Sequence, residues 1–318
     1  MITNTGLCEL KDIMSYLDKV PYCVTRRSLY TAAELYEGFK ADKDGSYGSC
    51  FDGRVYQYYQ FTGTQEAGVE ESLARSLHDN GIHTALRHFF EEHDAHRCVG
   101  VMGGHALPRT DKIYRDIALL SKRLTEEGFI MLSGGGPGAM EATHLGAWMA
   151  GRSDGELDEA LALLTTVPSF QDEKWLSTAF QVIKRYPQER YVSLGIPTWL
   201  YGHEPSTPLA THIAKFFDNS IREDNILTLA DGGLIYTPGS AGTMQEIFQE
   251  AVQNHYLSFG FASPMVFLGK HFWTHEMPVF PLLEQLMETG KYKNLLLTLT
   301  DDIDEIIDEL VQFGKNRG

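Results

Sequence analysis

The sequence predicts an α/β protein with a doubly wound parallel sheet, preceded by a helix-rich N-terminal extension. From residue 96 onward, short apolar segments that suit buried strands alternate with longer segments of helical periodicity. Three of the apolar segments end in glycine-rich turns, and ligands of parallel sheets bind at the carboxyl ends of the strands. The expected fold is therefore Rossmann-like, with residues 96–318 forming the sheet domain and residues 1–95 the extension.

The elements of the sheet domain follow one another in a regular order. We expect strands at 97–103, at the start of 129–151, and at 190–197, 232–239, 263–269 and 294–300. We expect helices at 111–128, in the second half of 129–151, at 209–225, at 243–257, and after Asp301 or Asp302 as the N-cap.

The extension has a different pattern. Helical periodicity is present in 8–20 and in 66–92. Between them, residues 45–63 alternate tyrosines with polar residues and glycines, which predicts a short hairpin or an extended arm. No chemistry is visible in residues 1–95, so extra packing, a cover over a site and an oligomer contact all remain open.

Composition excludes several functions. There are 27 Lys and Arg against 43 Asp and Glu, a net charge of -16 that would repel nucleic acids and anionic membranes. No apolar run approaches the ~18 residues of a membrane helix, and the N-terminal residues lack a signal-peptide pattern, so a cytoplasmic location is expected. The cysteines form no CxxC pair and the histidines at 83, 88, 93 and 96 have no i,i+4 spacing. We therefore expect no metal and no cofactor.

The first two glycine-rich turns have open interpretations. Gly103 and Gly104 follow the first strand of the domain, where they allow close approach of a ligand or serve as ordinary turn residues. Four glycines at 134–138 are costly in conformational entropy, and a helix start after them suits an anion. Their spacing also fits a G-x-G-x-x-A dinucleotide fingerprint, although that motif usually follows the first strand.

The third turn, Pro238 to Thr243, precedes a helix that carries Glu246. Its glycines permit a nest of backbone N–H groups, and Thr243 is expected to cap the helix and to bind a phosphate oxygen. Glu246 lies three residues further on the same helix face, about one turn or roughly 5 Å away. That separation suits a ligand with a neutral ribose between its phosphate and the acid. The alternative is a capping box, in which Glu246 only completes the cap.

Arg222 precedes the strand that leads to this third turn, beside Glu223 and Asp224. An arginine next to two acids is usually a surface ion pair that contributes little.

Taken together, GGGPGAMEA at 134–142, the upstream Arg222 and PGSAGTMQE at 238–246 resemble the LONELY GUY (LOG) family. Its members are nucleoside 5′-monophosphate phosphoribohydrolases, often labelled lysine decarboxylases. The resemblance covers roughly residues 96–314 and is greatest to the longer bacterial branch that cleaves purine nucleotides. Ser240 departs from the family pattern P-G-G-x-G-T-x-x-E, and residues 151–215 and 1–95 have no counterpart of the same length in short members.

The resemblance implies hydrolysis of an N-glycosidic bond, with Arg222 and Glu246 as the catalytic pair and no metal. It also implies a homodimer or a higher homo-oligomer, with the site near the subunit boundary. The nucleotide- and phosphate-binding set that we predict comes from the three turns: Gly103, Gly104, Gly135, Gly136, Gly138, Glu141, Gly239, Ser240, Ala241, Gly242 and Thr243.

Three other functions remain as alternatives. A nucleotide sensor of the same fold would bind without cleaving, but pure binding does not require the acid. An NAD(P)-dependent oxidoreductase is supported only by the glycine spacing. A decarboxylase that uses pyridoxal phosphate lacks a lysine in a setting that suggests a Schiff base.

Overall fold

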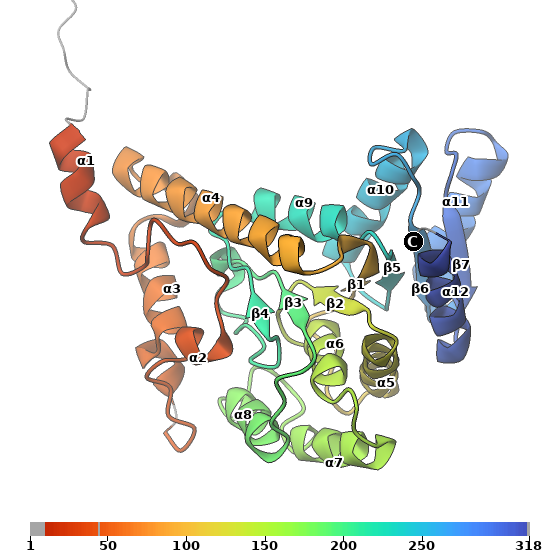
Figure 1. Cartoon of the computed structure of the whole chain (residues 1–318), viewed down its shortest axis with the longest axis horizontal. Coiled ribbons are helices and arrows are strands. Elements are labelled where there is room, and N and C mark those ends of the chain that lie inside the picture. Colours follow the sequence, from red (N-terminus) through yellow and green to blue (C-terminus); the bar gives the residue numbers. More distant parts are fainter. Residues whose placement is uncertain (1–9, 44, 317–318) are drawn as a thin grey trace, which may run out of the picture.

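The computed structural model describes residues 10–43 and 45–316. Its centre is a seven-stranded parallel sheet in the order β4-β3-β2-β1-β5-β6-β7 (Figure 1). The strands are β1 Cys98–Met102, β2 Ile130–Ser133, β3 Ser193–Gly195, β4 His212–Ile213, β5 Gly233–Tyr236, β6 Pro264–Leu268 and β7 Leu296–Thr300. The chain progresses outward from β1 in both directions, so the topological switch point lies between β1 and β5. This is the doubly wound, Rossmann-like α/β fold that the sequence predicts.

Helices cover both faces of the sheet. Those of the sheet domain are α5 Lys112–Glu126, α6 Ala139–Trp148, α7 Asp154–Leu164, α8 Trp175–Arg185, α9 Asn219–Leu229, α10 Ala241–Tyr256, α11 Val279–Glu288 and α12 Ile303–Lys315. Figure 1 shows α5 to α8 below the sheet and α9 and α10 above it. No helix in the described part of the chain is both long and apolar enough to span a bilayer.

Side chains of β1 alternate between two apolar cores. Val99 and Val101 pack with α5, α6 and α12, whereas Cys98 and Met102 belong to the core on the opposite face. This alternation follows from the two-residue period of a strand. Burial on both faces explains why the strands read as continuous apolar runs.

Most predicted elements are confirmed, including α12, whose N-cap Asp302 accepts a hydrogen bond from the Asp304 N–H at 2.9 Å. The helix predicted at 209–225 is wrong in its first half, because β4 occupies His212–Ile213 and α9 begins only at Asn219. Ile213 pairs with Gly195 of β3, and its N–H and C=O also bond to Tyr30 of the extension. Helices α7, α8 and α11 had no counterpart in the prediction.

The extension contains α1 Leu10–Leu17, α2 Ala32–Leu35, α3 Phe51–Phe61 and α4 Val69–Glu92. The expected hairpin or arm at 45–63 is wrong, because most of it is helix α3. Val55 and Tyr59, one turn apart, are buried on the inner face of α3. Gly53 is required by close packing rather than by a turn, since a Cβ there would overlap the Tyr47 carbonyl.

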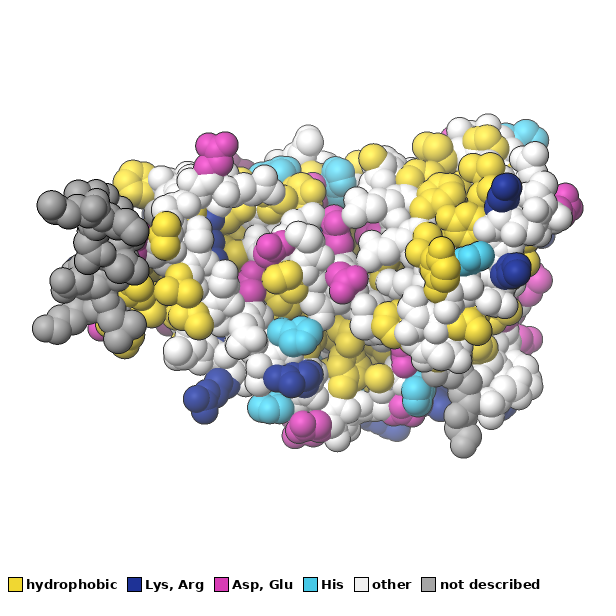
Figure 2. All heavy atoms as spheres, turned by 90° about the horizontal axis from the view of Figure 1, so that it is seen from above, with side chains coloured by type: hydrophobic (Ala, Val, Ile, Leu, Met, Phe, Trp, Pro, Cys, Tyr) yellow, Lys and Arg dark blue, Asp and Glu magenta, His cyan; other side chains and the backbone are white. Residues whose placement is uncertain are grey.

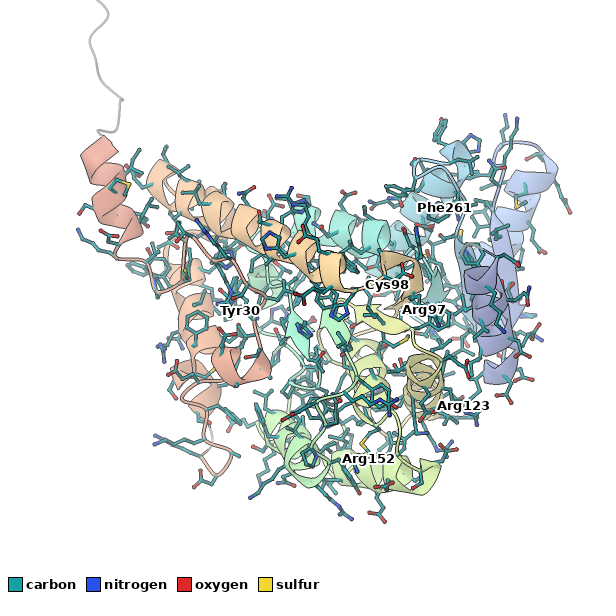
Figure 3. The ribbon with its side chains drawn as sticks, in the orientation of Figure 1. Tyr30, Arg97, Cys98, Arg123, Arg152 and Phe261 are labelled. Atoms are coloured by element: carbon teal, nitrogen blue, oxygen red, sulfur yellow. The ribbon has the colours of Figure 1, made fainter. Side chains whose placement is uncertain are left out.

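The extension shares one apolar core with the upper face of the sheet. Figure 3 labels Tyr30, which lies in the extension beside β4. Lys215 and Asp52 form a fully buried ion pair between the sheet domain and α3, with Nζ and Oδ1 2.6 Å apart. The same Asp52 oxygen accepts a hydrogen bond from the Trp199 indole at 2.9 Å. The extension therefore packs against the sheet domain through a shared apolar core and a buried ion pair.

We expect Asp52→Ala to lower the free energy of unfolding by about 3–5 kcal/mol, because it leaves the Lys215 ammonium buried and unpaired. Urea denaturation followed by circular dichroism measures this change. Asp42→Ala is the matched control, since Asp42 is exposed and its removal should change stability by less than about 0.5 kcal/mol. Equal urea midpoints for the two variants would show that the buried pair does not fasten the extension.

Candidate functional site

The three glycine-rich turns follow β1, β2 and β5, which are neighbours in the sheet, so the turns meet at one edge. Gly104 joins them through its backbone. Its N–H donates to the Pro238 carbonyl at 3.1 Å, and its carbonyl accepts from the Ala139 N–H at 3.2 Å. The first turn thus holds the second and third turns in a fixed arrangement.

Packing between the turns explains Gly103 of the first turn and Gly138 of the second. A Cβ on Gly103 would overlap the Thr237 hydroxyl and lie 2.8 Å from the Ala139 Cβ. Gly138 has a φ of +68°, and a Cβ there would overlap the Gly104 carbonyl. Both backbone groups of Gly104 are already bonded within the protein, so a direct ligand contact from Gly104 is not supported.

The third turn presents free backbone donors. Helix α10 begins at Ala241 with Ser240 as its N-cap, and no side chain caps its first turn. Ala241 and Gly242 are exposed, and a Cβ on Gly242 would meet nothing within 4 Å. Uncapped N–H groups at a helix start attract anions. The expectation that Thr243 caps the helix is wrong, because Thr243 lies inside the first turn and packs on Gly239.

Ser240 fits this turn without strain. Its φ of -125° lies in the ordinary region for residues with a side chain, and the residue is exposed. The departure from the family glycine therefore does not distort the turn.

Glu246 lies one turn beyond Thr243 on α10. Because the N-cap is Ser240, Glu246 is too far along the helix to complete a capping box. Its carboxylate accepts no hydrogen bond from the described residues. Burial raises the pKa of Glu246 to about 7, although the nearby Arg222 lowers that pKa and Glu223 raises it. A carboxyl group that exchanges its proton near neutral pH suits general acid–base chemistry.

Arg222 is not the surface ion pair that its neighbours in sequence suggest. Its side chain is only 12% exposed, and Nη1 lies 4.0 Å from Glu223. Nε donates to the Ile196 carbonyl at 3.0 Å, which orients the guanidinium. Nη2 lies 2.7 Å from the position that a Cβ of Gly134 would take, so the cation covers the second turn. The structure brings Arg222 into electrostatic contact with Glu246.

The start of α9, and with it Arg222, is held by the extension. Asp79 of α4 accepts hydrogen bonds from the N–H groups of Phe217 at 3.0 Å and Asp218 at 2.8 Å. Asp218 in turn caps α9 by accepting from the Ser220 N–H at 2.8 Å. Nothing in the periodicity of 66–92 indicated Asp79, because its partners are backbone groups about 140 residues away.

The glycines of the second turn lie beneath side chains. The Gly135 N–H donates to the Ser133 hydroxyl at 3.1 Å, and the Gly136 N–H points to the sulfur of Met140 at 3.4 Å. Both glycines are buried. Their predicted role in holding a ligand through the backbone is therefore not supported; this part of the site offers side chains instead.

The prediction that Glu141 contacts a nucleotide is also not supported. Its carboxylate is fully buried and accepts hydrogen bonds from Arg109 Nε and from the Tyr114 hydroxyl, each at 2.8 Å. Arg109 also donates to the Thr178 hydroxyl at 2.7 Å, which links α6 to α8. Glu141 is thus part of an internal network.

A cavity of about 800 Å³ lies between α4 and the first turn of α9 and is lined by residues such as Asp79, His83, Ser220 and Glu223. No residue of the three glycine turns lines it. The free N–H groups of α10 and the Glu246 side chain do not line it either. Among residues 10–43 and 45–316, no group of three or more acids, histidines or cysteines could hold a metal ion.

No family model matches the chain, and no curated protein matches it. Several solved structures are similar. The molybdenum cofactor binding protein of the phototrophic bacterium Rippkaea orientalis is 16% identical over 68% of this chain and 95% of that one, with a TM-score of 0.41. The Moco carrier protein of Chlamydomonas rheinhardtii is 18% identical over 68% and 96%, with a TM-score of 0.40. TM1055, a structural-genomics target, is 19% identical over 68% and 98%, with a TM-score of 0.42. These similarities concern the fold and do not identify a ligand.

We expect Gly103→Ala to destabilise the protein by roughly 1–3 kcal/mol, because the added methyl group overlaps Thr237 and Ala139. Thermal unfolding measures the loss. Gly155→Ala is the matched control: Gly155 lies in α7 with its nearest neighbour atom 3.9 Å from a Cβ, and alanine there should stabilise by roughly 0.5–1 kcal/mol. A stable Gly103→Ala variant would contradict the tight packing of the turns.

Proposed function

We propose that this protein hydrolyses the N-glycosidic bond of a nucleoside 5′-monophosphate to a free base and ribose 5-phosphate. Purine nucleotides are the substrates to test first. The observation that carries the proposal is the position of Glu246. A partly buried carboxyl group with a pKa near 7 lies one helical turn from an uncapped helix start and interacts electrostatically with Arg222, whose side chain is 12% exposed. The resemblance to the LOG family supports the same assignment.

In this proposal the 5′-phosphate binds the uncapped N–H groups at the start of α10, where Ala241 and Gly242 are exposed and Thr243 follows. The ribose then extends along the helix toward Glu246, roughly 5 Å further on. This order places the neutral sugar, and not the phosphate, beside the carboxylate. Local donors are needed because the protein as a whole carries a charge of -16.

The reaction breaks the bond from C1′ to the base nitrogen and forms a bond from C1′ to a water oxygen. Positive charge develops on the sugar in the transition state, and the Glu246 carboxylate stabilises it and accepts a proton from the attacking water. The departing base nitrogen then gains a proton from protonated Glu246, so that the two protons of the water end on the C1′ hydroxyl and on the free base. Arg222 remains charged throughout and keeps a fraction of Glu246 ionised at neutral pH.

The alternatives gain less support. The dinucleotide fingerprint requires free backbone donors in the second turn, but the N–H groups of Gly135 and Gly136 have internal partners. Two similar structures are described as binding or carrying molybdenum cofactor, yet their TM-scores of 0.41 and 0.40 limit the likeness to the fold. A non-catalytic nucleotide sensor remains the alternative that the experiments below distinguish.

We also propose a homo-oligomer, as the family resemblance implies. Apolar side chains gather on the face above the C-terminal end of α10 (Figure 2), where Val252, Tyr256, Leu257 and Phe259 are exposed. Such a group of large apolar residues is typical of a protein interface.

Incubation with AMP, GMP, IMP and CMP should release a free base from at least one nucleotide, detected by chromatography. Glu246→Gln should lower kcat by about 100-fold or more while nucleotide binding is retained, because the amide cannot take a proton. Glu189→Gln, the same change on an exposed residue, is the control and should keep full activity. Tight binding without base release by the wild type would establish the sensor instead, and a Glu246→Gln variant with most of its kcat would remove Glu246 from the mechanism.

The rate should depend on pH through Glu246. The ionised form is the active one, so kcat/KM should rise with pH and level off above a pKa of about 7. Arg222→Met removes the cation that lowers this pKa, and the rising limb of the pH–rate profile should move to higher pH.

The stability of the protein should also depend on pH through Glu246. Because the folded pKa lies above the usual 4.5, ionisation of Glu246 disfavours folding as the pH rises from 4.5 through 7. Glu246→Gln should therefore raise the melting temperature at pH 8 but not at pH 4, and equal shifts at both would contradict the raised pKa.

A further inference from the structure

Glu204 stands over the second glycine turn and has no part in the proposed hydrolysis. Its segment is fastened to the turn by the Thr207 N–H, which donates to the Gly135 carbonyl at 2.8 Å. Oε2 of Glu204 lies 3.9 Å from the position that a Cβ of Gly136 would take. Arg222 covers Gly134 of the same turn in the same way, at 2.7 Å. One turn therefore carries a cation and an anion two residues apart.

The Glu204 carboxylate has two histidine neighbours but no hydrogen-bond donor among the described residues. Its side chain is only 15% exposed. His105 Nε2 and His203 Nε2 lie 3.6 and 3.7 Å from its Oε1, which is too far for good hydrogen bonds. The carboxylate accepts no hydrogen bond from any residue of 10–43 or 45–316 that the structure describes. The carboxylate is therefore able to accept a hydrogen bond from a ligand donor.

Met140 forms the floor between the two charges. Its Sδ lies 2.8 Å from a Cβ position on Gly134, and its Cε lies 2.9 Å from one on Gly136. The surface that a ligand meets at this turn is thus a guanidinium, a thioether and a carboxylate. A flat heterocycle can pack on the thioether and present its edge to Glu204.

The position suits the base end of a nucleotide. The second and third turns follow β2 and β5, which are separated by β1 alone. Two strand spacings of roughly 4.8 Å place the turns about 10 Å apart. A nucleoside monophosphate whose phosphate lies at the start of α10 has a comparable reach, so its base would arrive above the second turn.

We propose that Glu204 is a specificity-determining residue that recognises the base by accepting hydrogen bonds from its N–H groups. The proposal rests on the proposed function for the orientation of the nucleotide. Because a carboxylate only accepts hydrogen bonds, it selects bases that carry amino or ring N–H donors and disfavours a purine that has none.

The test compares AMP with purine riboside 5′-monophosphate, whose base lacks the amino group. Calorimetry in the Glu246→Gln background, where neither nucleotide should be consumed, should show AMP binding at least about tenfold more tightly. Adding Glu204→Met should bring the ratio of the two Kd values near one and leave the Kd of purine riboside 5′-monophosphate nearly unchanged. Glu189→Gln, added in place of the Glu204 change, should keep the ratio of the parent.

An unchanged ratio in the Glu204→Met variant overturns the assignment, and so does a ratio near one in the parent. Glu204→Gln, which is nearly isosteric, serves as the second variant if the methionine variant does not fold; it should reduce the ratio partly. If the wild type hydrolyses no nucleotide, the same titrations in the wild type keep the two proposals distinguishable. Discrimination that depends on Glu204 would then support base recognition without catalysis, and binding of neither nucleotide would overturn both.

Discussion

The backbone of Gly104 is the connection on which the arrangement of the site depends. Its N–H reaches the turn after β5 and its carbonyl reaches the helix start after β2, so one peptide segment holds both neighbouring turns. The contact is possible only because Gly103 and Gly138 have no side chains. The side chains of the site lie next to these turns. Arg222 covers Gly134, and Glu246 lies one helical turn beyond the third turn.

Electrostatics of the site are local, because the net charge of -16 opposes an anionic ligand at long range. In the proposed function, the free N–H groups at the start of α10 bind the phosphate, and Arg222 supplies a cation near Glu246. Glu246 then experiences two opposing influences. Burial and Glu223 favour its neutral form, while Arg222 favours the ionised form. In the proposed hydrolysis, this balance near neutral pH allows Glu246 to act as a proton acceptor.

The extension affects the position of Arg222 indirectly. Asp79 holds the two N–H groups that precede α9, and α9 carries Arg222. The buried pair of Lys215 and Asp52 fastens α3 to the same region of the sheet domain. The extension therefore shapes one wall of the site through backbone hydrogen bonds and a buried charge pair, without supplying any of the proposed reacting groups.

The sequence by itself determined the fold class, the order of nearly all the strands along the chain and the position of the glycine-rich turns, because apolar periodicity and glycine clusters are local signals. It left Glu246 undecided between a cap and an acid, and it misassigned 45–63 and 209–225. The tertiary structure excludes the capping box for Glu246, because the N-cap is Ser240, and it corrects the two misassigned segments. The helical conformation around Gly53 depends on its packing partners, which the spacing of glycines and tyrosines does not show. The roles of Glu141, Asp79 and Glu204 likewise depend on partners far away in the chain, such as Arg109, Phe217 and the second turn. Local spacing specifies a turn or a helix, whereas burial and the presence or absence of a hydrogen-bond partner exist only after the chain has packed.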